Sequence, residues 1–326
     1  SELNEPGTPG FAKVGIQGFG KSGKSCTGAL LAIAIRRHFG ITSPIAMFDT
    51  ENGSGYLKPL FEALEVPFLP VRARAFDRMM EWAELLVRNH IEVGFVDSIT
   101  HPWEELKASY LAQVNEDRHN RDLDPLSRLG FTAWQKVKPH WQRWPDWFIN
   151  SPVHMVVAGR ARLDFAEEEN DEGQKELRVT GVSMRTESQF TYENGLLVEM
   201  TARQDRKASR PRVVRDIITL GDRFSVMDGK FGTFVTHGND HKRHLEAVWD
   251  YFKPHIEMLD PKSHATVDLE GSSEHNVKDG NSAYQREKKE RDILLERLLA
   301  ECMRRFPSTG GADKKKKIEF MEQHFG

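Results

Sequence analysis

A glycine-rich stretch near the start of the chain has the residue types and the spacing of a phosphate-binding loop (P-loop). Residues 18–25 read GFGKSGKS, which fits the pattern G-x-x-x-x-G-K-[ST]. Glycines let backbone N–H groups point at phosphate oxygens, and the N-terminus of the following helix adds partial positive charge. The pattern therefore predicts that Lys24 binds the β- and γ-phosphates of ATP and that the Ser25 hydroxyl binds Mg²⁺.

The same stretch allows a second register, because Gly15 to Ser22 also fits the pattern. Choosing Lys24 leaves residues 11–17 as a full strand before the loop, whereas choosing Lys21 shortens that strand and places two glycines inside the helix. We therefore assign the phosphate lysine to Lys24 and keep Lys21 as a loop residue. The residues expected at the nucleotide are Gly18, Phe19, Gly20, Lys21, Ser22, Gly23, Lys24, Ser25 and Cys26.

Acidic residues follow two apolar strand segments downstream of the loop. Residues 91–96 run into Asp97, and residues 45–48 run into Asp49-Thr50-Glu51. An Asp at the end of an apolar strand downstream of a P-loop is the Walker B pattern, whose carboxylate binds Mg²⁺, usually through water. An Asp that only opens a turn is the alternative, but the P-loop favours the metal role. Ser25 and Asp97 are therefore the expected metal-binding residues.

Basic residues further along the chain are candidates for phosphate contacts. Arg160 follows an apolar strand, and parallel sheets bind ligands at the carboxyl ends of their strands, so this arginine is expected to face the nucleotide. A basic tract comes later and consists of Arg203, Arg206, Lys207, Arg210, Arg212 and Arg215. A solvated face and a surface that follows a nucleic-acid backbone both explain this tract.

Three histidines, His237, His241 and His244, have a spacing that some metal sites use. Their segment is polar and turn-like, and the sequence offers no residue that would orient the rings. A metal site here is therefore only weakly supported.

The composition limits the classes of protein to which the chain can belong. Its 326 residues are 38% hydrophobic and 29% charged with a formal net charge of −3, so nucleic-acid binding would need a local basic patch. The only cysteines are Cys26 and Cys302, which excludes a disulfide scaffold and a cysteine-based zinc module. The absence of long apolar stretches predicts no membrane partner. The expected location is the cytoplasm.

Alternating strand and helix patterns predict an α/β fold with a mostly parallel central sheet. Strands are expected at 11–17, 45–48, 66–71, 91–96 and 154–158, and the two prolines of 66–71 favour a sheet edge. Helices are expected after Lys24, at 56–64, at 76–87 and at 131–149. Tryptophans in the last helix favour packing against the sheet over a stacking platform for bases.

Other segments are expected to be irregular or to turn. The polar residues 104–131 predict a long irregular excursion, and 161–180 predict a mobile loop or a hairpin tip. Residues 186–200 predict two strands joined at Asn194-Gly195.

The predicted domain organisation places one large core between smaller segments. Residues 1–10 are expected to form a flexible arm, 11–258 the ATPase core, 259–285 a linker and 286–326 a small helical C-terminal module.

The motifs together resemble the RecA-like branch of P-loop ATPases. The resemblance rests on the P-loop, on the strand ends at residues 48–51 and 95–98, and on Gly221-Asp222-Arg223, and it covers about residues 11–235. The wider pattern is similar to phage-encoded ATPases of homologous recombination and single-strand annealing. This resemblance implies that Glu51 polarises the attacking water and that Arg223 reaches the nucleotide of a neighbouring subunit. It also implies a homo-oligomer, as a ring or a filament.

The expected activity is Mg²⁺-dependent ATP hydrolysis coupled to work on single-stranded DNA in phage recombination, annealing or replication. Lys24, Glu51, Arg160 and Arg223 are the expected catalytic residues, and ATP and Mg²⁺ the expected ligands. Single-stranded DNA would contact Arg203, Arg206, Lys207, Arg210 and Arg212. A phage origin would place the protein in the host cytoplasm. The alternatives are a ring-type DNA motor or helicase, and an ATP-switched binding module that recruits partners and hydrolyses slowly.

Overall fold

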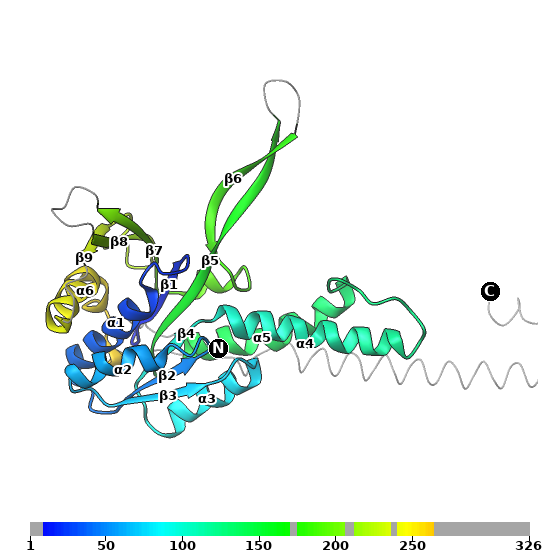
Figure 1. Cartoon of the computed structure of the whole chain (residues 1–326). Coiled ribbons are helices and arrows are strands. Elements are labelled where there is room, and N and C mark those ends of the chain that lie inside the picture. The colour runs from blue at the N-terminus through cyan, green and yellow to red at the C-terminus, as the bar shows by residue number, and fades with distance from the viewer. Residues whose placement is uncertain (1–8, 170–174, 206–211, 236–239, 264–326) are drawn as a thin grey trace, which may run out of the picture. The chain divides into compact units, whose positions relative to one another are not determined.

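The computed structural model describes residues 9–169, 175–205, 212–235 and 240–263 (Figure 1). The chain divides into two compact units, Ser1–Thr266 and Val267–Gly326, and the second unit lies outside the described residues. The predicted helical module, most of the predicted linker and most of the predicted arm therefore lie there as well. The predicted core of residues 11–258 falls within the first unit, and its exact boundary stays a prediction.

The described residues form a mostly parallel sheet with the strand order β3-β2-β4-β5-β1-β7-β8-β9, and β6 pairs with β5. The strands are β1 (Lys13–Gly18), β2 (Ile45–Asp49), β3 (Phe68–Arg72), β4 (Val93–Asp97), β5 (His154–Glu169), β6 (Lys175–Met184), β7 (Leu196–Asp205), β8 (Arg212–Asp222) and β9 (Phe231–Val235). The strands from β3 to β7 along this order pair in parallel, and β8, β9 and β6 join antiparallel. This confirms the predicted α/β class and the position of β3 at the edge.

Helices cover both faces of the sheet (Figure 1). They are α1 (Lys24–His38), α2 (Ser54–Ala63), α3 (Phe76–Arg88), α4 (Thr100–His119), α5 (Phe131–Asn150) and α6 (His241–Ile256). Because neighbouring strand residues point to opposite faces, Met47 packs with α1, α2 and α6, whereas Phe48 packs with α3, α4 and α5. Both faces are buried, so the central strands are continuously apolar. None of the described helices is long and apolar enough to cross a membrane.

The tryptophans of α5 behave as the packing hypothesis predicts. Trp141 and Trp144 are buried in the core between α3, α4, α5 and the sheet. Pro139 and Pro145 lie inside the helix, which continues through both of them. These two buried rings therefore cannot stack with nucleic-acid bases.

Two sequence-based expectations are wrong. The first is the irregular excursion at 104–131, because α4 runs to His119 and only 120–130 lack a helix or strand. Only Thr100, Pro102, Trp103 and Leu106 are buried in α4. Beyond Leu106, polar and charged residues outnumber apolar ones, and Tyr110, Leu111 and Val114 are only partly buried, so the sequence signal for a helix is weak there.

The second is the hairpin at Asn194-Gly195. Asn194 has extended backbone angles, and its side-chain Nδ2 donates to the carbonyls of Phe190 and Thr191, which closes the 3₁₀ helix η1 (Phe190–Glu193). The strand that follows, β7, pairs with β1 and β8 rather than with its preceding residues.

Of the two expectations for 161–180, a mobile loop or a hairpin, the described strands support the hairpin, and its turn at 170–174 lies outside the described residues. The part of β5 after Arg160 leaves the parallel sheet and pairs antiparallel with β6, from Ala161 opposite Met184 to Glu169 opposite Lys175. Figure 1 shows this two-stranded ribbon projecting from the sheet. Arg160 therefore lies at the base of the ribbon, where β5 passes from one pairing to the other.

Candidate functional site

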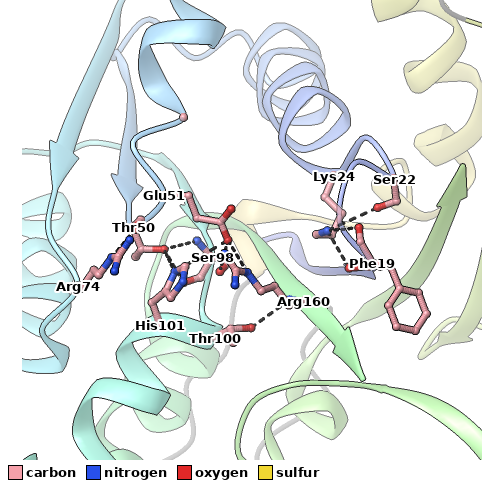
Figure 2. A network of polar contacts seen from close by, with 12 residues as sticks. Phe19, Ser22, Lys24, Thr50, Glu51, Arg74, Ser98, Thr100, His101 and Arg160 are labelled. Carbon is pink, nitrogen blue, oxygen red and sulfur yellow. Dashed lines mark hydrogen bonds and ion pairs between the residues drawn. The ribbon is translucent and has the colours of Figure 1, made fainter. Parts of the chain in front are cut away.

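The register of the parallel strands brings the predicted catalytic segments to one edge of the sheet. Asp49 at the end of β2 lies opposite Asp97 at the end of β4, and Gly18 at the end of β1 lies opposite Arg160 in β5. Strands β1, β2 and β4 end at this edge and β5 leaves the parallel sheet after Arg160, so segments far apart in the sequence converge here (Figure 2). The convergence includes the P-loop, Glu51, Asp97 and Arg160.

The P-loop has the backbone that its glycines predict. Gly23 adopts a left-handed conformation with φ of 101°, immediately before α1 begins at Lys24, as the chosen register requires. A Cβ atom built on Gly18 would lie 2.4 Å from the Met200 carbonyl oxygen, so only glycine fits there. Lys21 is exposed and also has a positive φ, of 63°.

The Lys24 ammonium lies inside the curve of the loop. Its Nζ donates to the carbonyl oxygens of Gly18, at 2.7 Å, and Phe19, at 2.9 Å (Figure 2). Burial lowers the pKa of Lys24, and the nearby carboxylates of Asp97 and Glu51 oppose that shift. The positive charge of Lys24 therefore lies near the carboxylates of Asp97 and Glu51, where it is expected to contact phosphate oxygens.

Ser25 and Asp97 are in direct contact. The Ser25 hydroxyl hydrogen-bonds the carboxylate of Asp97, which is 3% exposed. Burial, with the charges of Glu51 and Asp49, raises the pKa of Asp97 to about 6, although the Ser25 hydrogen bond and Lys24 oppose the shift. A hydroxyl beside a carboxylate fits Mg²⁺, which takes few protein ligands and keeps waters and phosphate oxygens in its shell.

The described residues contain no group of three or more His, Cys, Asp and Glu side chains that would hold a metal by themselves. His241 and His244 lie on α6, and His237 lies outside the described residues. The structure therefore gives no support to the weak histidine hypothesis among these residues.

The turn that carries Glu51 is organised by Asp49, a residue to which the sequence assigned no role. The buried Asp49 carboxylate accepts hydrogen bonds from the backbone N–H groups of Glu51, at 3.1 Å, Gly53, at 2.9 Å, and Ser54, at 2.8 Å. Burial alone would raise the pKa of Asp49, but a hydrogen bond from the Ser54 hydroxyl, together with these backbone hydrogen bonds, outweighs it and the pKa is lowered. An Asp before turn-forming residues is a sequence signal for such a contact.

Glu51 is the centre of a polar network at this edge (Figure 2). Its Oε1 accepts from Arg160 Nε at 2.9 Å and from the Ser98 hydroxyl at 3.1 Å, and His101 Nδ1 lies 3.9 Å away. Burial would raise the pKa of Glu51, but the hydrogen bond and charge of Arg160, with Ser98 and His101, lower it. Glu51 therefore stays an ionised hydrogen-bond acceptor near neutral pH.

Further polar contacts hold the residues around Glu51 in place. The Thr50 hydroxyl accepts from the Ser98 N–H at 2.7 Å and lies 2.7 Å from His101 Nδ1, and the Thr100 hydroxyl accepts from the Arg160 N–H at 3.0 Å. Sequence reasoning did not find Thr50, Ser98, Thr100 or His101. Their positions beside the Asp97 and Glu51 motifs were the only available signal.

Arg223 lies at the opposite end of the strands from the P-loop. Strand β8 runs antiparallel to β7, so Asp222 pairs with Leu196 at the start of β7, whereas Met200 further along β7 pairs with Gly18. The Arg223 guanidinium contacts the Tyr192 carbonyl and lies 3.6 Å from the Glu193 carboxylate. Arg223 therefore does not reach the P-loop of its own chain.

Another arginine of the basic tract does reach the P-loop. A Cβ atom built on Gly23 would lie 2.2 Å from Cδ of Arg215, so the Arg215 side chain covers this glycine. Among the predicted DNA-binding residues, Arg203 forms an ion pair with Asp216. Arg212 begins β8. The remaining three, Arg206, Lys207 and Arg210, lie outside the described residues.

A family model described as an AAA domain matches residues 11–226. The chain belongs to the AAA domain family. The match contains the P-loop, Glu51, Asp97 and Arg160, and it ends before β9 and α6. This AAA domain is a P-loop ATPase that binds and hydrolyses ATP.

Comparison with curated proteins finds no match. Among solved structures, the chain is similar to a KaiC-like protein from the hyperthermophilic archaeon Pyrococcus horikoshii OT3. The two are 11% identical, the alignment covers 72% of this chain and 94% of that chain, and the TM-score is 0.42.

Proposed function

We propose that this AAA domain couples Mg²⁺-dependent ATP hydrolysis to work on single-stranded DNA as a homo-oligomer. The observation that carries the hydrolytic part is the position of Glu51. Its carboxylate lies at the same sheet edge as Lys24 and Asp97 and is close enough to both to shift their pKa values. A carboxylate held there, outside the P-loop itself, suits a group that orients water.

Each residue of the site has a distinct role in this proposal. The P-loop N–H groups and Lys24 bind the phosphates, and Ser25 and Asp97 hold Mg²⁺. The bound cation supplies charge neutralisation at the phosphates. Glu51 accepts a proton or hydrogen bond from the attacking water. Arg160 and Ser98 hold the Glu51 carboxylate in place, so they are positioning residues.

Exchanging Glu51 for glutamine tests the hydrolytic part. Glu51→Gln should bind ATP with near-normal affinity and hydrolyse it about a hundredfold or more slowly, the scale for losing a general base. Glu92→Gln, at an exposed position before β4, is the matched control and should leave both quantities unchanged. Lost ATP binding in Glu51→Gln, or unchanged turnover, would contradict the role given to Glu51.

The DNA part of the proposal is supported by the sequence resemblance to phage ATPases and by the basic tract. Replacing Arg206, Lys207 and Arg210 with alanine should weaken binding of single-stranded DNA and flatten its salt dependence, by about 0.7 in slope for each lost phosphate contact. An unchanged slope would move the DNA site elsewhere.

The same preparations separate the three activities that remain open. DNA-stimulated hydrolysis with annealing and no unwinding supports the role in phage recombination, which would take place in the cytoplasm of an infected cell. Unwinding supports a ring motor or helicase. Absence of both DNA binding and stimulation supports an ATP-switched binding module that recruits partner proteins.

The proposed oligomer is supported by the resemblance to RecA-like ATPases. Arg223 lies away from the P-loop of its own chain, so a role at a nucleotide would require a neighbouring chain. Lys24→Ala keeps Arg223 intact, and Arg223→Ala keeps the P-loop intact. If Arg223 acts between subunits, mixing the two inactive variants should restore hydrolysis, because some interfaces then combine an intact P-loop with an intact arginine. An arginine of this kind is worth about 10³-fold in rate, which makes the recovery measurable. Mixed oligomers that stay inactive would contradict the role of Arg223.

A further inference from the structure

The imidazole of His101, in the first turn of α4, lies beside Thr50 and Glu51 (Figure 2). Its Nδ1 is 2.7 Å from the Thr50 hydroxyl and 3.9 Å from Oε1 of Glu51, and only 16% of the side chain is exposed. Thr50 and Ser98 are buried, so water cannot replace the contacts that they make. A largely enclosed imidazole in contact with the support of Glu51 is therefore a candidate for a role in hydrolysis.

Thr50 connects this imidazole to Ser98 and so to Glu51 (Figure 2). The Thr50 carbonyl accepts from Nε of Arg74 at 2.9 Å, which holds the backbone of Thr50. The Thr50 hydroxyl accepts from the Ser98 N–H at 2.7 Å and lies 3.1 Å from the Ser98 carbonyl oxygen. The Ser98 hydroxyl in turn donates to Oε1 of Glu51 at 3.1 Å. His101, Thr50, Ser98 and Glu51 therefore form one continuous chain of polar contacts.

The single proton of the Thr50 hydroxyl indicates which nitrogen of His101 carries hydrogen. If the hydroxyl donates to the Ser98 carbonyl, Nδ1 of His101 donates to the hydroxyl oxygen, and all three contacts of that oxygen are hydrogen bonds. If the hydroxyl donates to Nδ1 instead, the Ser98 carbonyl loses this donor and a nitrogen lone pair lies near the Glu51 carboxylate. The network of contacts therefore favours the tautomer with hydrogen on Nδ1.

The groups around the imidazole keep it neutral near neutral pH. Burial and the charge of Arg160, on β5, lower the pKa of His101, and Arg74 acts in the same direction. The carboxylates of Glu51 and Glu104 oppose this shift but do not outweigh it. The neutral ring is therefore a hydrogen-bond donor that adds no second positive charge beside the ion pair of Glu51 and Arg160.

We propose that His101 is a positioning residue for ATP hydrolysis and holds the Glu51 carboxylate in place through Thr50 and Ser98. The inference rests on the proposed role of Glu51 and adds to it a residue that acts through its neighbours rather than on the reacting atoms. The Nδ1–H group occupies one lone pair of the Thr50 oxygen, so the hydroxyl proton is directed at the Ser98 carbonyl. The backbone of Ser98 is then held at its N–H and its carbonyl, while its hydroxyl contacts Glu51.

Three substitutions at His101 separate the Nδ1–H group from the rest of the ring. His101→Ala should lower kcat about 10- to 100-fold and leave ATP affinity unchanged, the scale of a catalytic group misplaced by up to about 1 Å. His101→Asn places an amide N–H near the position of Nδ1 and should restore most of the rate. His101→Gln reaches the position of Nε2 instead and should be as slow as His101→Ala.

The control for these variants is His119→Ala, at an exposed position at the end of the same helix, which should keep the wild-type rate. A wild-type rate in His101→Ala would overturn the inference. So would a rate in His101→Gln that equals or exceeds the rate in His101→Asn.

Thr50 provides a second measurement that does not depend on the folding of the His101 variants. Thr50→Val removes the hydroxyl and should slow hydrolysis about as much as His101→Ala, whereas Thr50→Ser keeps the hydroxyl and should retain most of the rate. Combining Thr50→Val with His101→Ala should slow hydrolysis by no more than about twofold beyond either single change, because both remove the same contact. Losses that multiply would show that His101 does not act through Thr50 and would overturn the inference.

The outcomes also separate this inference from the proposed function. Wild-type rates in the His101 and Thr50 variants, with Glu51→Gln still slow, overturn the role of His101 alone. Unchanged turnover in Glu51→Gln overturns the role of Glu51 and, with it, the inference about His101.

Discussion

The Asp49 carboxylate offers the sharpest test of how the fold positions the turn that carries Glu51. Asp49 is 1% exposed, and its two oxygens accept three backbone N–H groups of the turn that carries Glu51. Asp49→Ala removes all of these acceptors, whereas Asp49→Asn keeps one oxygen and points an amide at a backbone donor. The two variants therefore remove the same contacts to different extents, completely in Asp49→Ala and partly in Asp49→Asn.

The structure sets the size of the effect. A hydrogen bond to a charged group contributes about 1.5–3 kcal/mol, which would total about 4.5–9 kcal/mol for three independent bonds. Glu51 and Gly53 are at least partly open to water, which can replace their lost bonds, whereas Ser54 is buried. We therefore expect Asp49→Ala to lower the free energy of unfolding by about 3–5 kcal/mol, and Asp49→Asn by about 1.5–3 kcal/mol.

The assay is urea unfolding of the full chain followed by tryptophan fluorescence, with ATP binding and turnover measured on the folded variants. Asp250→Asn, exposed on α6, is the matched control and should be neutral. The lowered pKa of Asp49 adds a pH signature. Its stabilisation is present above the ordinary carboxyl pKa and is lost as pH falls through the lowered value, so wild type and Asp49→Asn should converge at low pH. Unfolding free energies within about 0.5 kcal/mol of wild type, with normal turnover, would refute this reasoning.

Three further outcomes are expected. Lys24→Ala should abolish ATP hydrolysis and Lys21→Ala should retain much of it, and full activity in Lys24→Ala would refute the chosen register. Arg160→Ala should slow hydrolysis about a hundredfold through displacement of Glu51 while ATP binding persists, the scale of a catalytic group misplaced by about 1 Å; Arg160→Lys should recover part of the rate. Burial lowers the pKa of His154 from 6.5 to about 3, so the unfolded chain binds its proton first as pH falls. Stability of the wild type should therefore drop between pH 6.5 and pH 4.5 by about 2–3 kcal/mol more than that of His154→Asn, in paired urea titrations.

Contiguous residues were enough to predict the parts of the site that depend on local backbone geometry. The glycines of the P-loop, the helix that starts at Lys24, and the apolar strands that end at Asp49 and Asp97 all follow from short patterns. Such patterns work because φ angles and side-chain alternation are properties of neighbouring residues. The same reasoning failed for α4, because its turns beyond Leu106 carry more polar than apolar residues and none of those residues is buried.

Contacts between distant residues required the tertiary structure. Arg160 and Glu51 are 109 positions apart, and their hydrogen bond exists because β4 pairs with both β2 and β5 in one register. The direction of β8 decides that Arg215 meets the P-loop and Arg223 does not.

By itself, the sequence determined the phosphate-binding loop and the identity of the acidic residues at its side. Only the tertiary structure decided which basic side chains meet them, and that the strand and helix after residue 226 close a pocket over α1. The physical reason is that strand order and register are set by burial of both faces of the sheet, a property of the packed chain rather than of any short segment.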